Sequence, residues 1–73
     1  MSKLPHISGE QAVRALKKAS FEQASQKGSH VKLKHADGRV VIVPMHRELK
    51  TGTLKSILRQ AKLTADELLA LLS

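Results

Sequence analysis

Cysteine and aromatic residues are almost absent from this sequence of 73 residues, which has no cysteine, tryptophan or tyrosine and a single phenylalanine, Phe21. Without cysteine the chain forms no disulfide and offers no thiolate ligand to a metal, a composition that fits a reducing cytosol. Sheets that bind single-stranded nucleic acid by stacking display two or more aromatic rings, so one phenylalanine argues against that class. No disulfide or thiolate-bound metal therefore supplements the hydrophobic core.

Long apolar runs are also missing. No stretch approaches the roughly 18 residues of a membrane span, and residues 1–8 lack the apolar segment of a signal peptide. A chain of 73 residues leaves no room for two cores, so residues 1–73 are expected to form a single domain. We therefore expect a cytoplasmic protein with no membrane partner.

Acidic residues are few. Six Asp and Glu stand against thirteen Lys and Arg, which gives a formal charge of +7. This excess makes a polyanion the leading candidate partner and favours nucleic acid over a membrane, although a merely soluble basic protein would carry the same charge. The glutamates, at positions 10, 22, 48 and 67, are scattered along the chain. No pair of carboxylates is therefore expected for acid-base catalysis.

Three helices are predicted from their starts and from their apolar spacing. Ser8 with Gln11, and Thr64 with Glu67, form capping boxes that mark helix starts. Thr51 is the expected N-cap of a helix whose apolar residues recur at i, i+3, i+4 and i+7. The predicted helices cover residues 9–19, residues 52–62 after the cap at Thr51, and residues 65–72.

Three strands are predicted between the first two helices. Residues 21–25 form the weakest candidate, residues 31–34 alternate apolar with charged side chains, and residues 39–43 are mostly β-branched. With so short a meander, the helices can cover only one face of the sheet. The predicted fold is a two-layer α+β domain. Its elements follow the order helix, three-stranded antiparallel sheet, helix, as in the double-stranded-RNA-binding domain, and a short extra helix follows at the C-terminus.

The turn between the second and third strands sets which side chains share a face. Asp37 and Gly38 are the preferred pair for a two-residue type I′ turn, which places Leu33 opposite Ile42. The predicted core face carries Val31, Leu33, Val40 and Ile42, and the predicted outer face carries His30, Lys32, Lys34, Val41 and Val43. Such an outer face, basic on one strand and apolar on the next, suits a polyanion flanked by a protein contact.

The four histidines are the only side chains here that normally change charge near neutral pH. His6 is expected to be exposed and His35 to be structural, at the edge of the core. His46, beside Arg47, is expected in a surface loop from which it could help to hold phosphate. His30 differs because it begins a strand directly after a Gly-Ser turn and shares a face with two lysines. It is the candidate general base or acid, although it could also simply contact phosphate.

Other catalytic arrangements fit the sequence poorly. His30 and His35 are predicted to face opposite ways and the nearby Asp37 is needed in the turn, so no metal site is expected. Ser29 adjoins His30 in a strand and would project to the opposite face, which rules out a serine triad of the two. One histidine in a cationic setting remains, and this is compatible with metal-free cleavage of RNA by its own 2′-hydroxyl.

Four segments give the sequence a resemblance to a known family. They are residues 27–30 (Lys-Gly-Ser-His), 35–39 (His-Ala-Asp-Gly-Arg), 43–46 (Val-Pro-Met-His) and 49–58 (Leu-Lys-Thr-Gly-Thr-Leu-Lys-Ser-Ile-Leu). At this spacing the sequence resembles the HicA family of mRNA-interferase toxins over nearly its whole length. The resemblance implies a fold like the double-stranded-RNA-binding domain, metal-independent RNA cleavage, a catalytic histidine at the position of His30, and neutralisation by a HicB-type antitoxin. Many members have proline where this chain has Ala36 and Thr51.

The expected function is therefore that of a toxin and metal-independent endoribonuclease that cleaves mRNA with His30 as its single catalytic histidine and with no cofactor. Gly28 would let the backbone approach the RNA, and Ser29 would donate to a phosphate oxygen. The candidates for holding phosphate and for stabilising the charge of the transition state are Lys27, Lys32 and Lys34.

Two other functions remain open from the sequence. A non-catalytic double-stranded-RNA-binding module would use the same fold and would span phosphates with a basic stripe on the second helix, formed by Lys55, Arg59 and Lys62. An adaptor would bind a protein instead. If the antitoxin exists, we expect it to dock on the outer sheet face, because Val41 and Val43 would otherwise expose apolar groups there.

Overall fold

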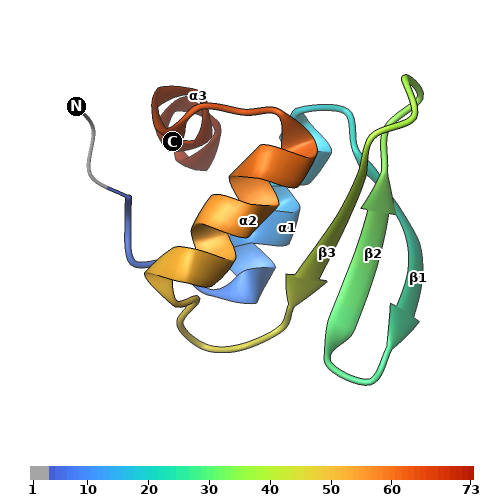
Figure 1. Cartoon of the computed structure of the whole chain (residues 1–73), viewed down its shortest axis with the longest axis horizontal. Helices are drawn as coiled ribbons and strands as arrows, with labels where there is room; N and C mark the ends of the chain where they lie inside the picture. Colours follow the sequence, from blue (N-terminus) through green and yellow to red (C-terminus); the bar gives the residue numbers. More distant parts are fainter. Residues whose placement is uncertain (1–3) are drawn as a thin grey trace.

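The computed structural model describes residues 4–73 and has the predicted two-layer α+β architecture. An antiparallel sheet in the order β1-β2-β3 is covered on one face by α1 and α2, and α3 packs against α1 (Figure 1). The elements are α1 (Gly9–Lys18), β1 (Glu22–Lys27), β2 (His30–Lys34), β3 (Val40–Pro44), α2 (Thr51–Ala61) and α3 (Ala65–Leu72). This arrangement is consistent with a fold like the double-stranded-RNA-binding domain, and the short C-terminal helix is confirmed.

Capping boxes begin two of the helices, as predicted. At α1 the Ser8 hydroxyl accepts the backbone N–H of Gln11 at 3.0 Å, and the Gln11 side chain accepts the N–H of Ser8 at 2.9 Å. At α3 Thr64 and Glu67 exchange the same two bonds at 3.1 and 2.9 Å. Each box satisfies backbone donors that the first turn of a helix leaves without partners.

The start of α2 differs from the prediction by one residue. Its N-cap is Lys50, which has extended backbone angles and no side-chain hydrogen bond, and Thr51 is already helical. The preceding residue, Leu49, is buried, and its N–H donates to the Ile7 carbonyl at 2.8 Å. This anchor fixes the point at which the chain enters the helix, so Thr51 does not serve as the cap.

The register between β2 and β3 also differs from the predicted one by one residue. Leu33 lies opposite Val41 rather than Ile42. Because side chains alternate along a strand, this shift moves every side chain of β3 to the other face of the sheet. The core face carries Val31, Leu33, Val41 and Val43, and the outer face carries His30, Lys32, Lys34, Val40 and Ile42.

A three-residue turn is the cause of this shift. The His35 N–H donates to the Arg39 carbonyl at 2.9 Å, and the Gly38 N–H donates to the His35 carbonyl at 2.9 Å. The hairpin is therefore closed by His35 and Arg39 around residues 36–38. Gly38 has a φ of +102°, a conformation that glycine supplies readily at the last position of such a loop.

The expectation of an exposed apolar surface at Val41 and Val43 is wrong, because both side chains are fully buried at 0% exposure. Their neighbours Val40 and Ile42, each 39% exposed, take that place on the outer face. The outer face is thus basic on β2 and apolar on β3, as expected, but with different residues.

The two edges of the sheet are protected differently. The edge strand β1 (Glu22–Lys27) overlaps the strand predicted at residues 21–25. All of its residues are exposed, and it has a bulge at Ala24. On the opposite edge, the N–H of Ile42 donates to the side-chain oxygen of Gln60 on α2 at 3.0 Å. A side chain of α2 therefore occupies a backbone donor that an edge strand would otherwise present to solvent.

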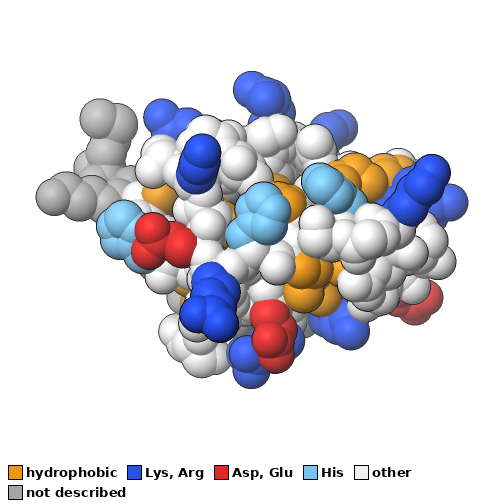
Figure 2. Space-filling model, turned by 90° about the horizontal axis from the view of Figure 1, so that it is seen from below, with side chains coloured by type: hydrophobic (Ala, Val, Ile, Leu, Met, Phe, Trp, Pro, Cys, Tyr) orange, Lys and Arg blue, Asp and Glu red, His pale blue; other side chains and the backbone are white. Residues whose placement is uncertain are grey.

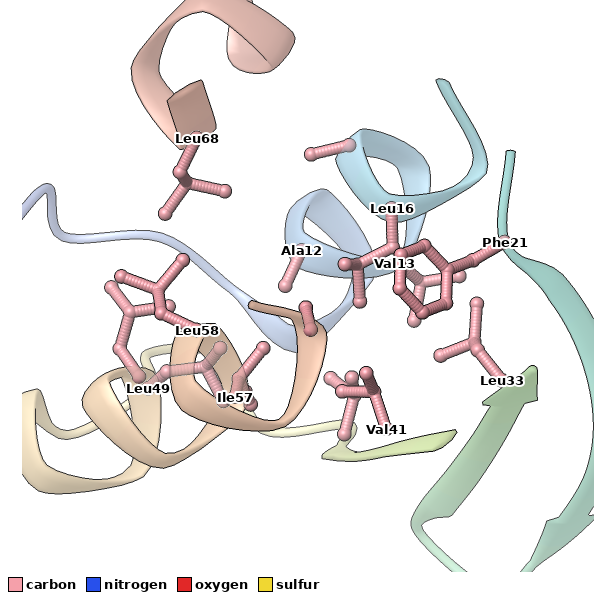
Figure 3. Packing of buried hydrophobic residues seen from close by; sticks show 14 of the residues in the cluster. Ala12, Val13, Leu16, Phe21, Leu33, Val41, Leu49, Ile57, Leu58 and Leu68 are labelled. Carbon is pink, nitrogen blue, oxygen red and sulfur yellow. The ribbon is translucent and has the colours of Figure 1, made fainter. Parts of the chain in front are cut away.

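The core lies between the sheet and the helices, and within residues 4–73 it buries no polar or charged side chain (Figure 3). Phe21, at 2% exposure, joins it from the segment between α1 and β1. Leu68 is the only buried residue of α3 and fixes that helix to the rest of the domain. Leu33 and Val41 contribute from the sheet, and both are inaccessible to solvent.

One arginine joins the hairpin turn to the helical layer. The Arg39 guanidinium donates to the carboxylate of Asp37, with 2.8 Å between Nε and Oδ2, and also donates to the carbonyl of Ala61 at the end of α2. It lies 5.0 Å from the centroid of the Phe21 ring. Because cations are favoured at helix C-termini and over aromatic faces, Arg39 holds the far end of the hairpin against both α2 and the core.

Candidate active site

His30 is the first residue of β2 and follows a tight turn. Lys27 pairs with His30 across β1 and β2, with Gly28 and Ser29 between them. Gly28 has a φ of +60°, and a Cβ added there would meet no atom within 4 Å. Backbone conformation rather than space therefore favours glycine at this position. The side chains of Ser29 and His30 are exposed. Because Gly28 has no side chain, the backbone beside them is open to solvent.

The chain after β3 returns to the same end of the sheet. The ladder between β2 and β3 ends with His30 opposite Pro44. One residue further, the Met45 N–H donates to the Ser29 carbonyl at 2.6 Å. The first residues of the loop between β3 and α2 therefore run directly beside the turn that precedes His30.

The start of α1 closes against this loop. The Gly9 N–H donates to the His46 carbonyl at 2.9 Å. The approach is so close that a Cβ on Gly9 would lie 2.2 Å from the Pro44 oxygen and 2.8 Å from the Met45 Cα. Gly9 is thus required for close packing, and its contact fixes the backbone of His46.

Histidines gather at this end of the molecule, which Figure 2 shows face on, with lysine and arginine side chains around them. His6, His30 and His46 are all exposed and belong to the segments joined there. His6 is accompanied by a carboxylate, since its Nδ1 lies 3.8 Å from Oε1 of Glu48. The sequence placed His46 correctly on the surface, and its nearness to His30 follows from the pairing of the second and third strands, which the sequence-based prediction did not extend to His46.

The predicted phosphate-binding lysines share the outer face with His30, two of them next to it and Lys34 further along β2, beside the hairpin turn. Lys27 is the cross-strand partner of this histidine, and Lys32 and Lys34 follow it at alternate positions of β2, so all four side chains belong to the outer face. Lys32 is half-buried, and the other two lysines are exposed. Within residues 4–73 none of the three forms an ion pair, so their charges are available to a polyanion.

His35 is a structural residue, as predicted. Its ring packs edge-on against Phe21 with the ring centroids 5.1 Å apart, and its side chain is 20% exposed. Its Nδ1 accepts the backbone N–H of Asp37 at 3.1 Å, which helps to hold the hairpin turn. His35 belongs to the turn end of the hairpin, opposite to the end at which His30 lies.

The candidate site is an open face rather than a pocket. One hollow is lined by α1 with α3 and another by β1 with the hairpin, and neither includes His30, whose side chain is exposed. Among residues 4–73 no group of metal-ligating side chains is placed to hold an ion, and no helix there is long and apolar enough to cross a bilayer. An open basic face suits an extended polymer better than a small molecule.

Comparison with known proteins identifies the family. The model of a family described as the HicA toxin of bacterial toxin-antitoxin systems matches residues 9–63, well over half of the chain. No curated protein sequence matches the chain. The family consists of toxins that are generally ribonucleases, and each toxin has a cognate antitoxin. The chain therefore belongs to the HicA family of toxins from toxin–antitoxin systems.

Proposed function

We propose that this toxin is a metal-independent endoribonuclease that cleaves mRNA and uses His30 as its catalytic residue. The observation that carries the proposal is the position of His30, which is exposed at the start of β2 beside a glycine turn and shares the outer face with three lysines that form no ion pair within residues 4–73, Lys27 and Lys32 being the nearer two. Family membership supports the reaction class, since HicA toxins are generally ribonucleases.

RNA carries its own nucleophile, so the protein has to move protons and stabilise charge. A histidine takes the proton from the 2′-hydroxyl, the 2′-oxygen attacks phosphorus, and the bond from phosphorus to the 5′-oxygen breaks as that oxygen gains a proton. His30 is able to fill the two proton-transfer roles in turn. Lys27, Lys32 and Lys34 would hold the phosphates and stabilise the negative charge that grows on the phosphoryl oxygens.

Replacing His30 with alanine tests the assignment. The fold should tolerate His30→Ala within about 0.5 kcal/mol, because the side chain is exposed and the backbone pairing remains. Cleavage of single-stranded RNA should fall by about 100-fold or more while RNA binding survives. His6→Ala is the matched control, since His6 is also exposed at this end but is 3.8 Å from a carboxylate, and it should cleave normally.

The same assay separates the alternatives. Cleavage that persists in EDTA supports the metal-independent mechanism, and cleavage that EDTA abolishes contradicts it. Binding of duplex RNA without cleavage would favour the RNA-binding module, for which the exposed Lys55 and Arg59 of α2 and Lys62, the left-handed residue that caps its end, are the basic candidates. A folded His30→Ala protein that cleaves at the wild-type rate would show that the chemistry lies elsewhere.

We also propose that the cognate antitoxin is of the HicB type and covers the outer face of the sheet. Val40 and Ile42 place two apolar side chains, each 39% exposed, beside the β2 lysines. Changing both to lysine should weaken inhibition by the antitoxin and leave cleavage intact. Leu69→Lys is the control, because Leu69 of α3 is also exposed, at 38%, but lies away from the sheet, and this change should leave inhibition intact. Inhibition unchanged by the double substitution would exclude this face.

A further inference from the structure

We propose that His46 is a second catalytic residue, which works with His30 as an acid–base pair. The proposal rests on the proposed ribonuclease function. Instead of one histidine that serves first as base and then as acid, two histidines each carry out one of the two proton transfers. The sequence places His46 in a surface loop from which it could help to hold phosphate, and makes it the next candidate for the chemistry should His30 prove wrong. The arrangement of the backbone around it points to a more direct part in the reaction.

The position of His46 follows from the sheet. His30 lies opposite Pro44, and the bond from the Met45 N–H to the Ser29 carbonyl, 2.6 Å long, continues the ladder by one residue. His46 is therefore two residues beyond the partner of His30. Diagonal positions on two paired strands lie about 7–8 Å apart, a separation that one phosphodiester group can bridge, and His46 lies in the loop just past the end of this pairing.

The backbone of His46 is fixed although it lies in a loop. Its carbonyl accepts the Gly9 N–H at 2.9 Å, and Gly9 packs so closely on Pro44 that it has no space for a side chain. The side chain of His46 is nevertheless exposed. An exposed imidazole on a fixed backbone, beside the turn that precedes His30, is placed to meet the same ligand.

The chemistry uses two proton-transfer groups at once. One neutral imidazole removes the proton of the 2′-hydroxyl as the bond from the 2′-oxygen to phosphorus forms. The other, as imidazolium, gives its proton to the 5′-oxygen as the bond from phosphorus to that oxygen breaks. The products are a 2′,3′-cyclic phosphate and a 5′-hydroxyl, and proton exchange with water restores both imidazoles. The attacking and leaving oxygens lie on opposite sides of phosphorus, so two histidines serve them without rearrangement.

His6 is the comparison that the molecule itself provides. It is exposed at the same end, with its side chain 83% accessible, but its Nδ1 lies beside the Glu48 carboxylate. Its position is fixed by no strand pairing, since it precedes the cap of α1. His6→Ala therefore controls for the loss of a titratable, exposed histidine from this surface.

The test compares ordinary RNA with an oligoribonucleotide in which sulfur replaces the 5′-bridging oxygen at the cleaved linkage. A thiolate leaves without receiving a proton, so this substrate does not need the acid. On ordinary RNA we expect His30→Ala and His46→Ala each to lose about 100-fold or more of the cleavage rate. On the sulfur-bridged RNA one of the two variants should recover to within about tenfold of wild type, whereas the other should stay impaired.

The remaining outcomes contradict specific parts of the argument. If His30→Ala is inactive but His46→Ala and His46→Gln cleave normally, the proposed function stands and the role of His46 is wrong. If both impaired variants stay impaired on the sulfur-bridged RNA, or if His46→Lys restores cleavage of ordinary RNA, His46 holds phosphate and transfers no proton. If His30→Ala cleaves normally, the catalytic role of His30 fails and with it the pair, whereas wild-type protein that cleaves no RNA would overturn the ribonuclease function itself. Thermal unfolding of each variant shows whether a loss of activity reflects a loss of folded protein.

Discussion

Replacing Gly9 with alanine should destabilise this toxin, although alanine is normally the better helix residue. Gly9 is the first residue of α1, and a Cβ there would lie 2.2 Å from the Pro44 oxygen and 2.8 Å from the Met45 Cα. Both atoms belong to the backbone, so no side-chain rotation relieves the overlap. Ordinary contacts to a Cβ begin at 3.4 Å, and the start of α1 must therefore move away from the loop by about 1 Å.

The magnitude follows from two opposing terms. Alanine in place of glycine inside a helix gains at most about 1 kcal/mol. The displacement weakens the bond from the Gly9 N–H to the His46 carbonyl, worth about 0.5–1.5 kcal/mol, and disturbs packing at a cost of about 1–3 kcal/mol. We expect a net loss of about 1–2 kcal/mol, which for a domain of this size lowers Tm by about 4–8 °C per kcal/mol.

Gly52→Ala is the matched control, because Gly52 also lies in the first turn of a helix. A Cβ there meets no atom within 4 Å, and its φ is not positive. This substitution should stabilise the fold by about 0.5–1 kcal/mol. Urea unfolding followed by circular dichroism measures both variants. The reasoning is refuted if Gly9→Ala is as stable as the wild type or if the two changes have the same sign.

Three further predictions concern the core, the hairpin turn and the outer face. Leu33→Ala, at a side chain with 0% exposure, should cost about 2–5 kcal/mol in urea unfolding, and a loss below 1 kcal/mol would contradict its central place in the core. The pKa of Asp37 lies below its ordinary 3.8, first because the backbone N–H of Arg39 donates to the carboxylate and next because the Arg39 guanidinium does. The free energy of unfolding should therefore fall as pH drops below about 4 and this carboxylate takes up a proton. In urea unfolding midpoints measured between pH 3 and 6, Asp37→Asn should flatten this fall. A plot of the logarithm of the RNA-binding constant against the logarithm of the salt concentration should have a slope of about −0.7 per phosphate contact. Replacing Lys32 and Lys34 with glutamine should make this slope, measured by fluorescence anisotropy, shallower by about 1.4. An unchanged slope would show that neither lysine contacts the RNA.

The sequence predicted those elements whose signals are local. Both capping boxes involve residues three apart, so a short stretch of sequence specifies them completely. The strand register is a different case, because Asp-Gly fits both a two-residue and a three-residue loop. The run of apolar residues from Val40 to Val43 is hydrophobic on both faces and gives no alternation from which to choose. The turn length, visible only in the bonds between His35, Gly38 and Arg39, decides the register.

The candidate site divides in the same way. His30 could be named from its place at the start of a strand after Gly-Ser and among lysines, all within a few residues. The nearness of His46 depends on the pairing of β2 with β3 and on the packing of Gly9, which is 37 positions away along the chain. The signal that could have found it is Pro44, which marks the end of β3: counting across the hairpin from His30 reaches this end in either register, with His46 one or two residues beyond the partner of His30.

The protection of the sheet edges limits how this toxin can be recognised. Gln60 occupies the N–H of Ile42 on one edge, and β1 on the other is interrupted by its bulge and begins and ends in charged residues. Such edges discourage a partner from adding a strand through main-chain bonds, which almost any sequence could do. A partner that meets the sheet meets side chains instead. Matched substitutions in toxin and antitoxin can then change partner choice and leave the fold untouched, so that related pairs in one cell are able to remain separate.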